Sequence, residues 1–384
     1  MDCLLNASVR RDAAYRGLFD PDDYAAVTSF YEAHPELPPT PLISLPGLAA
    51  ELSVAGLLIK DETGRFGLEA FKIAGARYGV ERIGRAALSN GIVCATAGNH
   101  GRAVARAARE SGVACTVFVP APRPDAHQVE LRTRRARVAA MQADGAQTID
   151  VNGSYEEAVR RAAEHAQATG ATIVSDTAWP GYEEIPRLIM LGYTRIFEET
   201  AHQWNRRPDV LLVQGGVGGL ICAAANWLAW RFGPARPFLI ACEPESAACL
   251  LESARAGRLV NIEERASGPA EHEGSALTGR RAAHSGMHTF MAGLRCAEPS
   301  PAAWPSIHAG VDAFLSIPDA LALEAMARLG QPIAGDPAIH AGPSGACGVG
   351  ALFAVLAAPE AAAVRRACDL NQSTRVMAVV TESP

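Results

Sequence analysis

Short apolar runs alternate with longer amphipathic stretches along most of the chain. The apolar runs have the length of buried strands, and the amphipathic stretches repeat apolar residues every three or four positions, as helices do. The pattern predicts strands at 57–59, 92–95, 115–119, 148–151, 172–174, 210–213, 238–242 and 375–380. It predicts helices at 22–33, from near Leu68, and at 100–111, 125–143, 155–169, 183–204, 219–232, 245–256, 319–329 and 345–357. This alternation indicates βαβ units, a mainly parallel sheet and an α/β fold class.

One long stretch, residues 257–318, carries little regular pattern and is rich in Gly, Ser and His. A stretch of this kind is either an active-site flap or a long surface connection. We favour the surface connection.

The composition adds limits on function. The chain has 384 residues, 49% hydrophobic and 20% charged, with a net charge of −6. This length suffices for two lobes with substantial cores. The arginines at 132, 134, 135 and 137 are interpreted as a solvated helix face, with nucleic-acid binding as the lesser alternative.

Cysteine use and hydropathy bear on location. Nine cysteines occur without a CxxC pair or a His/Cys metal spacing, which favours free thiols and no metal site. The first residues lack the apolar core of a signal peptide, and no apolar run reaches transmembrane length. The sequence therefore predicts a cytoplasmic protein without a membrane partner.

Lys72 is the first candidate for chemistry, because it follows an apolar strand and a polar turn where a helical pattern has begun. Its neighbours on such a helix, Leu68, Gly75 and Ala76, are apolar or small. Burial lowers the pKa of an amine, and a neutral amine can form a Schiff base with a carbonyl cofactor. The alternative is a surface lysine whose stem lies along the protein.

A glycine-rich loop, VQGGVGGLICAA at 213–224, follows an apolar strand and opens a helix. Backbone N–H groups in that position form a cradle for a phosphate. The loop is not the dinucleotide fingerprint, since Ile221 takes the third glycine position, and no Lys-Ser/Thr pair follows as in a P-loop. We expect a single phosphate there, and tight strand–helix packing is the alternative.

Two further loops follow predicted strands. In ATAGNHGRA, residues 96–99 present backbone N–H groups suited to a carboxylate, and Asn99 can donate to a phenolate-like oxygen or cap the helix. His100 is interpreted as a structural neighbour. In SDTAWPGY, Asp176 either binds a substrate ammonium, takes a proton, or caps a helix.

The lysine, the TAGNHG loop and the GGVGGL cradle, in this order, resemble the fold type II pyridoxal-phosphate enzymes, the group of tryptophan synthase β and threonine dehydratase. The motifs IKDE..RFGL.AFK, SDTAWxGY..IP, GxSGA.G and VVxTE are similar to those of diaminopropionate ammonia-lyase and spread from residue 59 to 382. The resemblance implies two mainly parallel α/β domains, the smaller inserted in the larger, and usually a homodimer. We expect the small domain at 91–189 and the large, cofactor-binding domain at 1–90 and 190–384.

The resemblance also implies residues that bind pyridoxal 5'-phosphate. Lys72 would bind it as a Schiff base, Phe71 would pack beside its ring, and Asn99 would donate to its ring oxygen. A hydroxyl, from Ser344 or Thr381, would face the pyridine nitrogen. The phosphate would be bound by Gly215, Gly216, Val217, Gly218 and Gly219.

The reaction that the resemblance implies is β-elimination, most directly of 2,3-diaminopropionate to pyruvate and ammonia. Lys72 would remove the α-proton, and Asp176, the second catalytic residue, would lie near the substrate's amino groups. A dehydratase or a β-replacement synthase acting on another β-substituted L-alanine is the alternative, and a catalytically silent binding relative is less favoured. The substrate carboxylate would be lined by Thr96, Ala97 and His100.

Two positions depart from the family pattern. Ala97 stands where the family has an aspartate that handles the D-substrate, and Pro343 replaces an acid. Because Ala97 carries no acid–base group, we predict that the L-enantiomer is preferred.

Overall fold

The computed structural model describes residues 1–384 except 13–14, 16, 97, 123–125, 127, 264–286 and 334. Its strands are β1 (Asp2–Leu5), β2 (Leu42–Ser44), β3 (Gly56–Asp61), β4 (Ile92–Ala95), β5 (Cys115–Pro120), β6 (Gln147–Val151), β7 (Thr172–Ile173), β8 (Val210–Gln214), β9 (Phe238–Pro244), β10 (Ala313–Ile317) and β11 (Arg375–Val380). Its helices are α1 (Pro21–Glu32), α2 (Pro46–Glu51), α3 (Lys72–Ile83), α4 (Asn99–Glu110), α5 (Gln128–Ala143), α6 (Tyr155–Thr169), α7 (Glu184–Gln203), α8 (Gly219–Phe232), α9 (Cys249–Ala256), α11 (Trp304–Gly310), α12 (Asp319–Gly330), α13 (Pro343–Ala357) and α14 (Ala362–Ala367).

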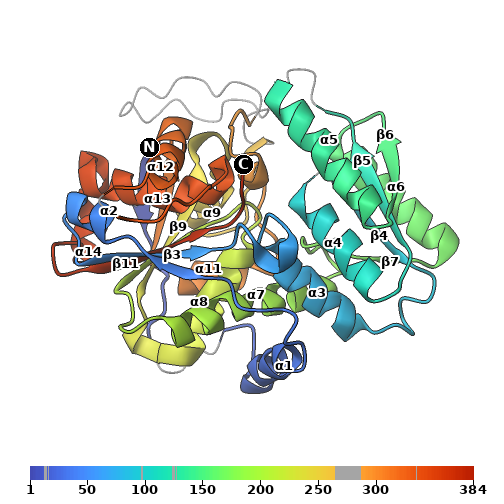
Figure 1. Ribbon diagram of the computed structural model, residues 1–384, viewed down its shortest axis with the longest axis horizontal. Coiled ribbons are helices and arrows are strands. Elements are labelled where there is room, and N and C mark those ends of the chain that lie inside the picture. The colour runs from blue at the N-terminus through green and yellow to red at the C-terminus, as the bar shows by residue number, and fades with distance from the viewer. Residues whose placement is uncertain are drawn as a thin grey trace.

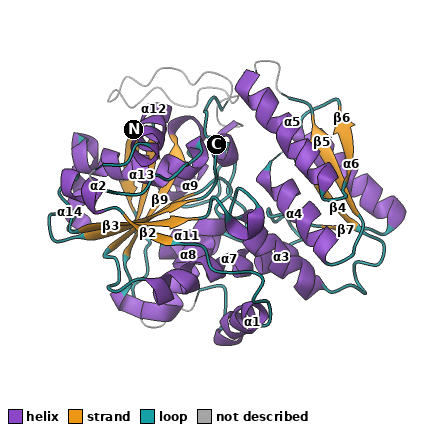
Figure 2. Ribbon diagram, in the orientation of Figure 1, coloured by secondary structure: helices purple, strands orange, loops and turns teal. Residues whose placement is uncertain are grey.

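The larger sheet has the order β1-β10-β9-β8-β11-β3-β2, with the two edge strands antiparallel and the five inner strands parallel. Figure 2 shows its strands in orange with helices on either side. Inner strands are apolar on both faces, as a sheet covered by two helical layers requires. In β8, Val210 and Leu212 face the core that contains α12 and α13, while Leu211 and Val213 face the core that contains α7 and α8. The predicted α/β class with mainly parallel strands is confirmed.

The smaller sheet, β6-β5-β4-β7, is parallel throughout. Helix α6 covers one face, while α4 and α5 cover the other. Helix α3 packs against both α4 and α7, so it lies between the two parts of the molecule (Figure 1). The predicted domain boundaries stay a prediction: all four strands fall within 91–189, but α7 runs across the second boundary.

Parts of the sequence-based expectation were wrong. Within the stretch 257–318, described residues form α11 and the fully buried strand β10, which pairs with β9 inside the sheet. That portion is core, whereas residues 264–286 lie outside the described part of the chain. The short edge strands β1 and β2 were also missed, because three or four residues give too little alternation to detect.

Among the described residues, no single helix is both long and apolar enough to cross a bilayer. Only the bent helix pair at 343–357 and 359–367 reaches that length and apolar character when its two members are taken together.

Candidate active site

The start of α3 is positioned by backbone hydrogen bonds to residues near the other end of the chain. Phe71 N–H donates to the carbonyl of Thr381 over 3.0 Å, and Ser383 N–H donates to that of Glu69 over 3.0 Å. Ala70 therefore forms an antiparallel bridge with Glu382 beyond the end of β11, Phe71 caps the helix, and the helix begins at Lys72 instead of near Leu68. This pairing brings the lysine to the carboxyl ends of β3 and β11, where ligands bind in parallel sheets.

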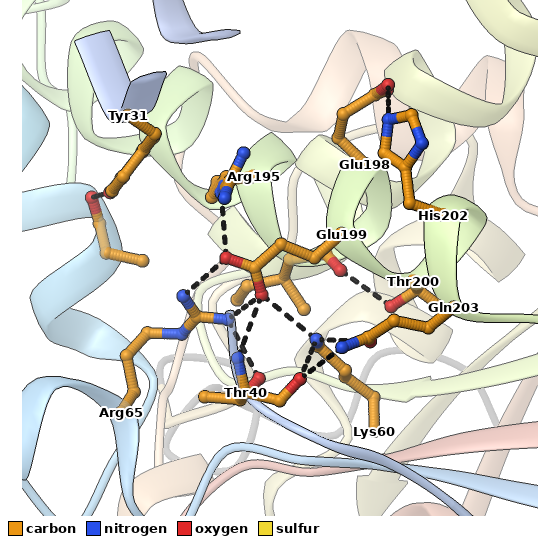
Figure 3. A network of polar contacts seen from close by, with 12 residues as sticks. Tyr31, Thr40, Lys60, Arg65, Arg195, Glu198, Glu199, Thr200, His202 and Gln203 are labelled. Atoms are coloured by element: carbon orange, nitrogen blue, oxygen red, sulfur yellow. Dashed lines mark hydrogen bonds and ion pairs between the residues drawn. The ribbon is translucent and has the colours of Figure 1, made fainter. Parts of the chain in front are cut away.

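A buried ionic network fixes the loop between β3 and Lys72 (Figure 3). Arg65 donates to Glu199 over 2.7 Å and to Glu62 over 2.7 Å, and Lys60 donates to Glu199 over 2.9 Å. Burial alone would raise the pKa of Glu199, but Arg65, Lys60 and Arg195 lower it well below its usual range. The carboxylate is thus held charged, and α7 is tied to the loop that leads to Lys72.

Lys72 and Asp176 form an ion pair of 2.5 Å between Nζ and Oδ2. Their side chains are 23% and 17% exposed. Asp176 comes from the loop after β7, so the pair joins the two parts of the molecule. His100 Nδ1 lies 3.8 Å from the same carboxylate oxygen, while its Nε2 contacts the carbonyl of Val174 over 3.0 Å.

The charges of this cluster differ from the sequence-based expectation. Burial alone would lower the pKa of Lys72, but the carboxylate of Asp176 outweighs burial and raises it. Burial alone would raise the pKa of Asp176, but His100 and Lys72 lower it. The expectation of a lowered pKa at the free Lys72 amine is therefore wrong, because its partner is 104 positions away in the sequence.

The glycine loop runs from the end of β8 into α8, with Gly218 as the N-cap in a left-handed conformation (φ 94°). A Cβ atom at Gly216 would lie 2.6 Å from Cys296 Sγ, and one at Gly215 would lie 2.5 Å from Ile221 Cδ1. A side chain at either position would require these neighbours to move, and the positive φ of Gly218 favours glycine at the N-cap. The N–H of Gly215 donates to the carbonyl of Cys242, whereas the first N–H groups of α8 have no intrahelical acceptor, which suits the binding of an anion.

Ser344 and Thr381 are brought together by Gln214, the last residue of β8. The Gln214 amide nitrogen lies 3.0 Å from Thr381 Oγ1 and 3.1 Å from the carbonyl of Ser344. Ser344 Oγ in turn accepts from the N–H of Gly293 over 3.0 Å. Both residues are buried, and the choice between their hydroxyls stays open.

Asn99, the first residue of α4, donates from its side-chain amide to the carboxylate of Glu382. Phe71 packs against Tyr193 at 4.9 Å between ring centroids, and its own ring centroid lies 5.3 Å from the Lys72 amine. Thr96 Oγ1 accepts from the N–H of Gly98 over 2.9 Å, which shapes the loop before α4. Ala97 lies outside the described residues.

Sequence reasoning missed three residues that line this region. The buried Tyr193 hydroxyl has no hydrogen-bond partner among the described residues and is electrostatically coupled to Lys72 and Asp176. Cys296 lies against Gly216, and burial together with Asp176 raises the pKa of its thiol to about 11. Glu382 belongs to the VVxTE motif, which was the only sequence signal that pointed to any of the three.

The described residues contain no group of three or more His, Cys, Asp or Glu side chains arranged to hold a metal ion. The groups of the site that can bind a ligand or react are an amine, a carboxylate and a set of backbone N–H donors.

Comparison with known proteins supplies the family. The family model described as "Pyridoxal-phosphate dependent enzyme" matches residues 34–381. Diaminopropionate ammonia-lyase of Escherichia coli K12 is 32% identical over 95% of this chain and 89% of its own length. The Salmonella typhimurium LT2 protein of that name is 31% identical over 93% of this chain and 88% of its own length.

Solved structures agree. The E. coli diaminopropionate ammonia-lyase in complex with an aminoacrylate-PLP azomethine reaction intermediate has a TM-score of 0.82 at 30% identity. The match covers 100% of this chain and 93% of that one. The same enzyme in complex with D-serine also has a TM-score of 0.82 at 30% identity, with the same coverage.

Proposed function

The chain belongs to the family of pyridoxal-phosphate dependent enzymes and, within it, to the diaminopropionate ammonia-lyases, and we propose that it converts 2,3-diaminopropionate to pyruvate and ammonia. The observation that carries this proposal is the Lys72–Asp176 pair, an amine and a carboxylate 2.5 Å apart beside a glycine-rich helix start. These residues fit pyridoxal 5'-phosphate, which needs a lysine for its aldehyde and backbone donors for its phosphate. When bound, the cofactor supplies an electron sink for the carbanion that forms at the α-carbon.

Several residues would hold the cofactor. Lys72 would attach it, and the N–H groups of Gly216 to Gly219 would bind its phosphate at the start of α8. We propose Gly215 as a neighbour that shapes this turn, since its own N–H is bonded within the sheet. Phe71 would pack beside the ring, and Asn99, released from Glu382, would donate to the ring oxygen.

Proton transfer falls to the residues around Lys72. The lysine amine, once released by substrate, would take the α-proton, and the ionised Asp176 would hold a substrate ammonium or receive a proton from it. His100 Nδ1 lies 3.8 Å from the same Asp176 oxygen that Lys72 contacts, and this proximity helps to lower the pKa of Asp176. The proposal assigns catalysis to Lys72 and Asp176, with Thr96, Ala97 and His100 around the substrate carboxylate.

Substrate choice is the finer part of the proposal. We propose a preference for the L-enantiomer, since Ala97 has no acid–base group, although the similar E. coli enzyme has been solved with D-serine. A dehydratase or a β-replacement synthase acting on another β-substituted L-alanine remains the second candidate, favoured by the same small residue at position 97.

The test is to measure pyruvate release from L- and D-2,3-diaminopropionate and from L-serine, and 2-oxobutyrate release from L-threonine. We expect the fastest release from L-2,3-diaminopropionate, with the D-form slower by about 100- to 10,000-fold, the usual cost of a missing general base. Faster release from L-serine would support the dehydratase, and equal rates for both enantiomers would contradict the stereochemical preference.

We also propose a homodimer that acts in the cytoplasm on a small amino acid, without nucleic-acid or membrane partners. The family resemblance supports the dimer, and the mild net charge of −6 supports the absence of a nucleic-acid partner. Sedimentation of the cofactor-loaded protein at the mass of one chain, 40.3 kDa, would contradict the dimer.

A further inference from the structure

The loop that carries Asp176 is cross-linked within itself. The N–H of Ser175 donates to the hydroxyl of Tyr182 over 2.9 Å, and the N–H of Thr177 donates to Ser175 Oγ over 3.2 Å. Trp179 and Tyr182 exchange two backbone hydrogen bonds, and their rings stack with centroids 4.0 Å apart. The internal bonds fix the shape of the loop, so a contact at one of its residues helps to place all of it.

One such contact comes from Ser300, which lies shortly before α11 in the larger part of the molecule. The N–H of Ala178, two residues after Asp176, donates to Ser300 Oγ over 3.1 Å. Ser300 is fully buried and Ala178 nearly so, which leaves no water to replace this acceptor if it is lost. The ion pair of Asp176 with Lys72 is a second contact between the loop and the larger part.

The backbone of Ser300 contacts the glycine loop before α8. Its N–H donates to the carbonyl of Val217 over 2.9 Å. The peptide bonds of the described residues are all trans, and in a planar trans peptide the C=O and the following N–H point in opposite directions. The N–H of Gly218 therefore points away from Ser300. Ser300 thus fixes the orientation of a peptide group that is proposed to bind the cofactor phosphate.

We propose that Ser300 is a positioning residue that holds the Asp176 loop in register with the glycine loop. One residue makes both contacts, through its N–H to Val217 and through its hydroxyl to Ala178. A shift of one loop relative to the other breaks one of the two hydrogen bonds. The inference rests on the proposed function, because it concerns the placement of Asp176 relative to a substrate on the bound cofactor.

The ion pair with Lys72 cannot by itself keep Asp176 in place during the reaction. In the proposed function the Lys72 amine is attached to the cofactor, released and attached again, so its contact with Asp176 changes in every turnover. The hydrogen bond between Ala178 and Ser300 involves no reacting atom and no ionisable group, so it is kept throughout. Misplacement of a catalytic group by about 1 Å can cost on the order of 100-fold in rate.

The test is Ser300→Ala in the cofactor-loaded protein. Alanine keeps the backbone N–H that contacts Val217 and removes the acceptor of the Ala178 N–H. We expect kcat/KM to fall by about 10- to 100-fold, from the loss of one buried hydrogen bond and the displacement of Asp176. The dissociation constant of the cofactor should stay nearly unchanged. The substrate is whichever of the amino acids named above the unmodified protein converts fastest.

A double variant tests whether Ser300 acts through Asp176. In the Asp176→Asn background, Ser300→Ala should lower kcat/KM by less than about twofold, because the effects of coupled residues are not additive. Ser306→Ala is the matched control: this serine is also buried, but its hydroxyl donates to Asn226 over 3.3 Å. The control should lower the melting temperature and leave kcat/KM unchanged.

Three results would overturn the proposal. Equal kcat/KM in Ser300→Ala and the unmodified protein would show that the hydroxyl places nothing that the reaction needs. An equally large loss in the Asp176→Asn background would show that Ser300 acts independently of Asp176. A loss of cofactor affinity as large as the loss of kcat/KM would assign Ser300 to the glycine loop alone.

Failure of the proposed function has a different signature. If the unmodified protein converts L-serine or L-threonine but not 2,3-diaminopropionate, the proposed substrate is wrong. The comparison between Ser300→Ala and the unmodified protein still tests the role of Ser300 in that case, because both are measured with the substrate that is converted.

Discussion

Lys60 lies near the end of β3, and Lys72 is the first residue of α3. Both lysines are paired with a carboxylate, but their surroundings differ. The Lys60 amine is fully buried and has three acceptors: Glu199, Gln203 and the carbonyl of Thr40. The Lys72 amine is 23% exposed and has one carboxylate partner, Asp176.

The difference separates a structural amine from a reactive one. All three hydrogens of the Lys60 ammonium are donated to fixed acceptors, so no free position remains for chemistry. Lys72 keeps open positions and borders a helix start suited to an anion. The saturated network holds the loop, and the open pair at its end is available to a cofactor and a substrate.

The largest effect is expected at Lys72. Lys72→Ala should abolish pyruvate formation, because one amine both attaches the cofactor and takes the proton. The fold should stay intact but the melting temperature should fall modestly, because the change removes the ion pair and leaves the Asp176 carboxylate without its partner. Pyruvate assays and mass spectrometry of borohydride-treated protein check this, and Lys72→Arg is the matched control for charge. Turnover above a trace in Lys72→Ala would show that another residue does the chemistry.

Asp176→Asn should lower kcat/KM by about 100- to 10,000-fold, the range for loss of an acid–base group.

Because the pKa of Asp176 is lowered and that of Lys72 is raised, their pair stabilises the fold above pH ~4 and below pH ~10. This stability is lost as pH falls through the lowered pKa of Asp176 or rises through the raised pKa of Lys72. Chemical denaturation should therefore give a constant difference between the variant and the unmodified protein from pH 5 to 9.

Loss of only stability, with kcat/KM unchanged, would make Asp176 a structural partner of Lys72 like Glu199 is of Lys60. That outcome would remove the contrast between the two pairs.

Glu199→Gln tests the closed network. Removing this carboxylate leaves Lys60 and Arg65 buried with too little compensating charge, which typically costs about 3–5 kcal/mol. Urea denaturation measures the loss, with Glu164→Gln as a control, because the exposed pair of Glu164 with Arg160 should contribute less than about 1 kcal/mol. A loss as small as that of the control would mean that the network does not hold the loop.

Glu243 differs from Glu199 and Asp176, because this buried carboxylate has no cationic partner in the described part of the chain. Its oxygens accept from the N–H groups of Leu250 and Leu251 over 2.7 and 2.8 Å, and burial raises its pKa to about 8. The folded state therefore keeps a proton that the unfolded chain has lost, and stability falls as pH rises from about 4.5 to 8, by up to about 1.4 kcal/mol per pH unit.

Glu243→Gln, which cannot ionise, should lack this slope. The free energy of unfolding of both proteins, followed by urea denaturation from pH 5 to 8, gives the comparison. Parallel curves would show that the carboxylate is already ionised at pH 5 in the folded protein.

The parts of the candidate site that local sequence motifs encode were predicted, whereas the parts that only folding brings together were not. Lys72, the TAGNHG loop and the GGVGGL loop were found in sequence, because each is a local pattern of residue types at a strand end. Their family was confirmed by the relatives. The orphan hydroxyl of Tyr193 and the thiol of Cys296 were not found, since an ordinary Tyr in a helix and a lone Cys carry no pattern.

The sequence by itself determined the α/β class, most strand and helix positions, and the order of motifs that identifies the family. These features depend on apolar periodicity and on residue types within a few positions of one another. Only the tertiary structure decided where α3 begins, because the acceptor for Phe71 N–H is Thr381 at the opposite end of the chain. It also decided the charge of Lys72, since a pKa depends on groups that folding brings within a few ångströms, here a carboxylate 104 positions away.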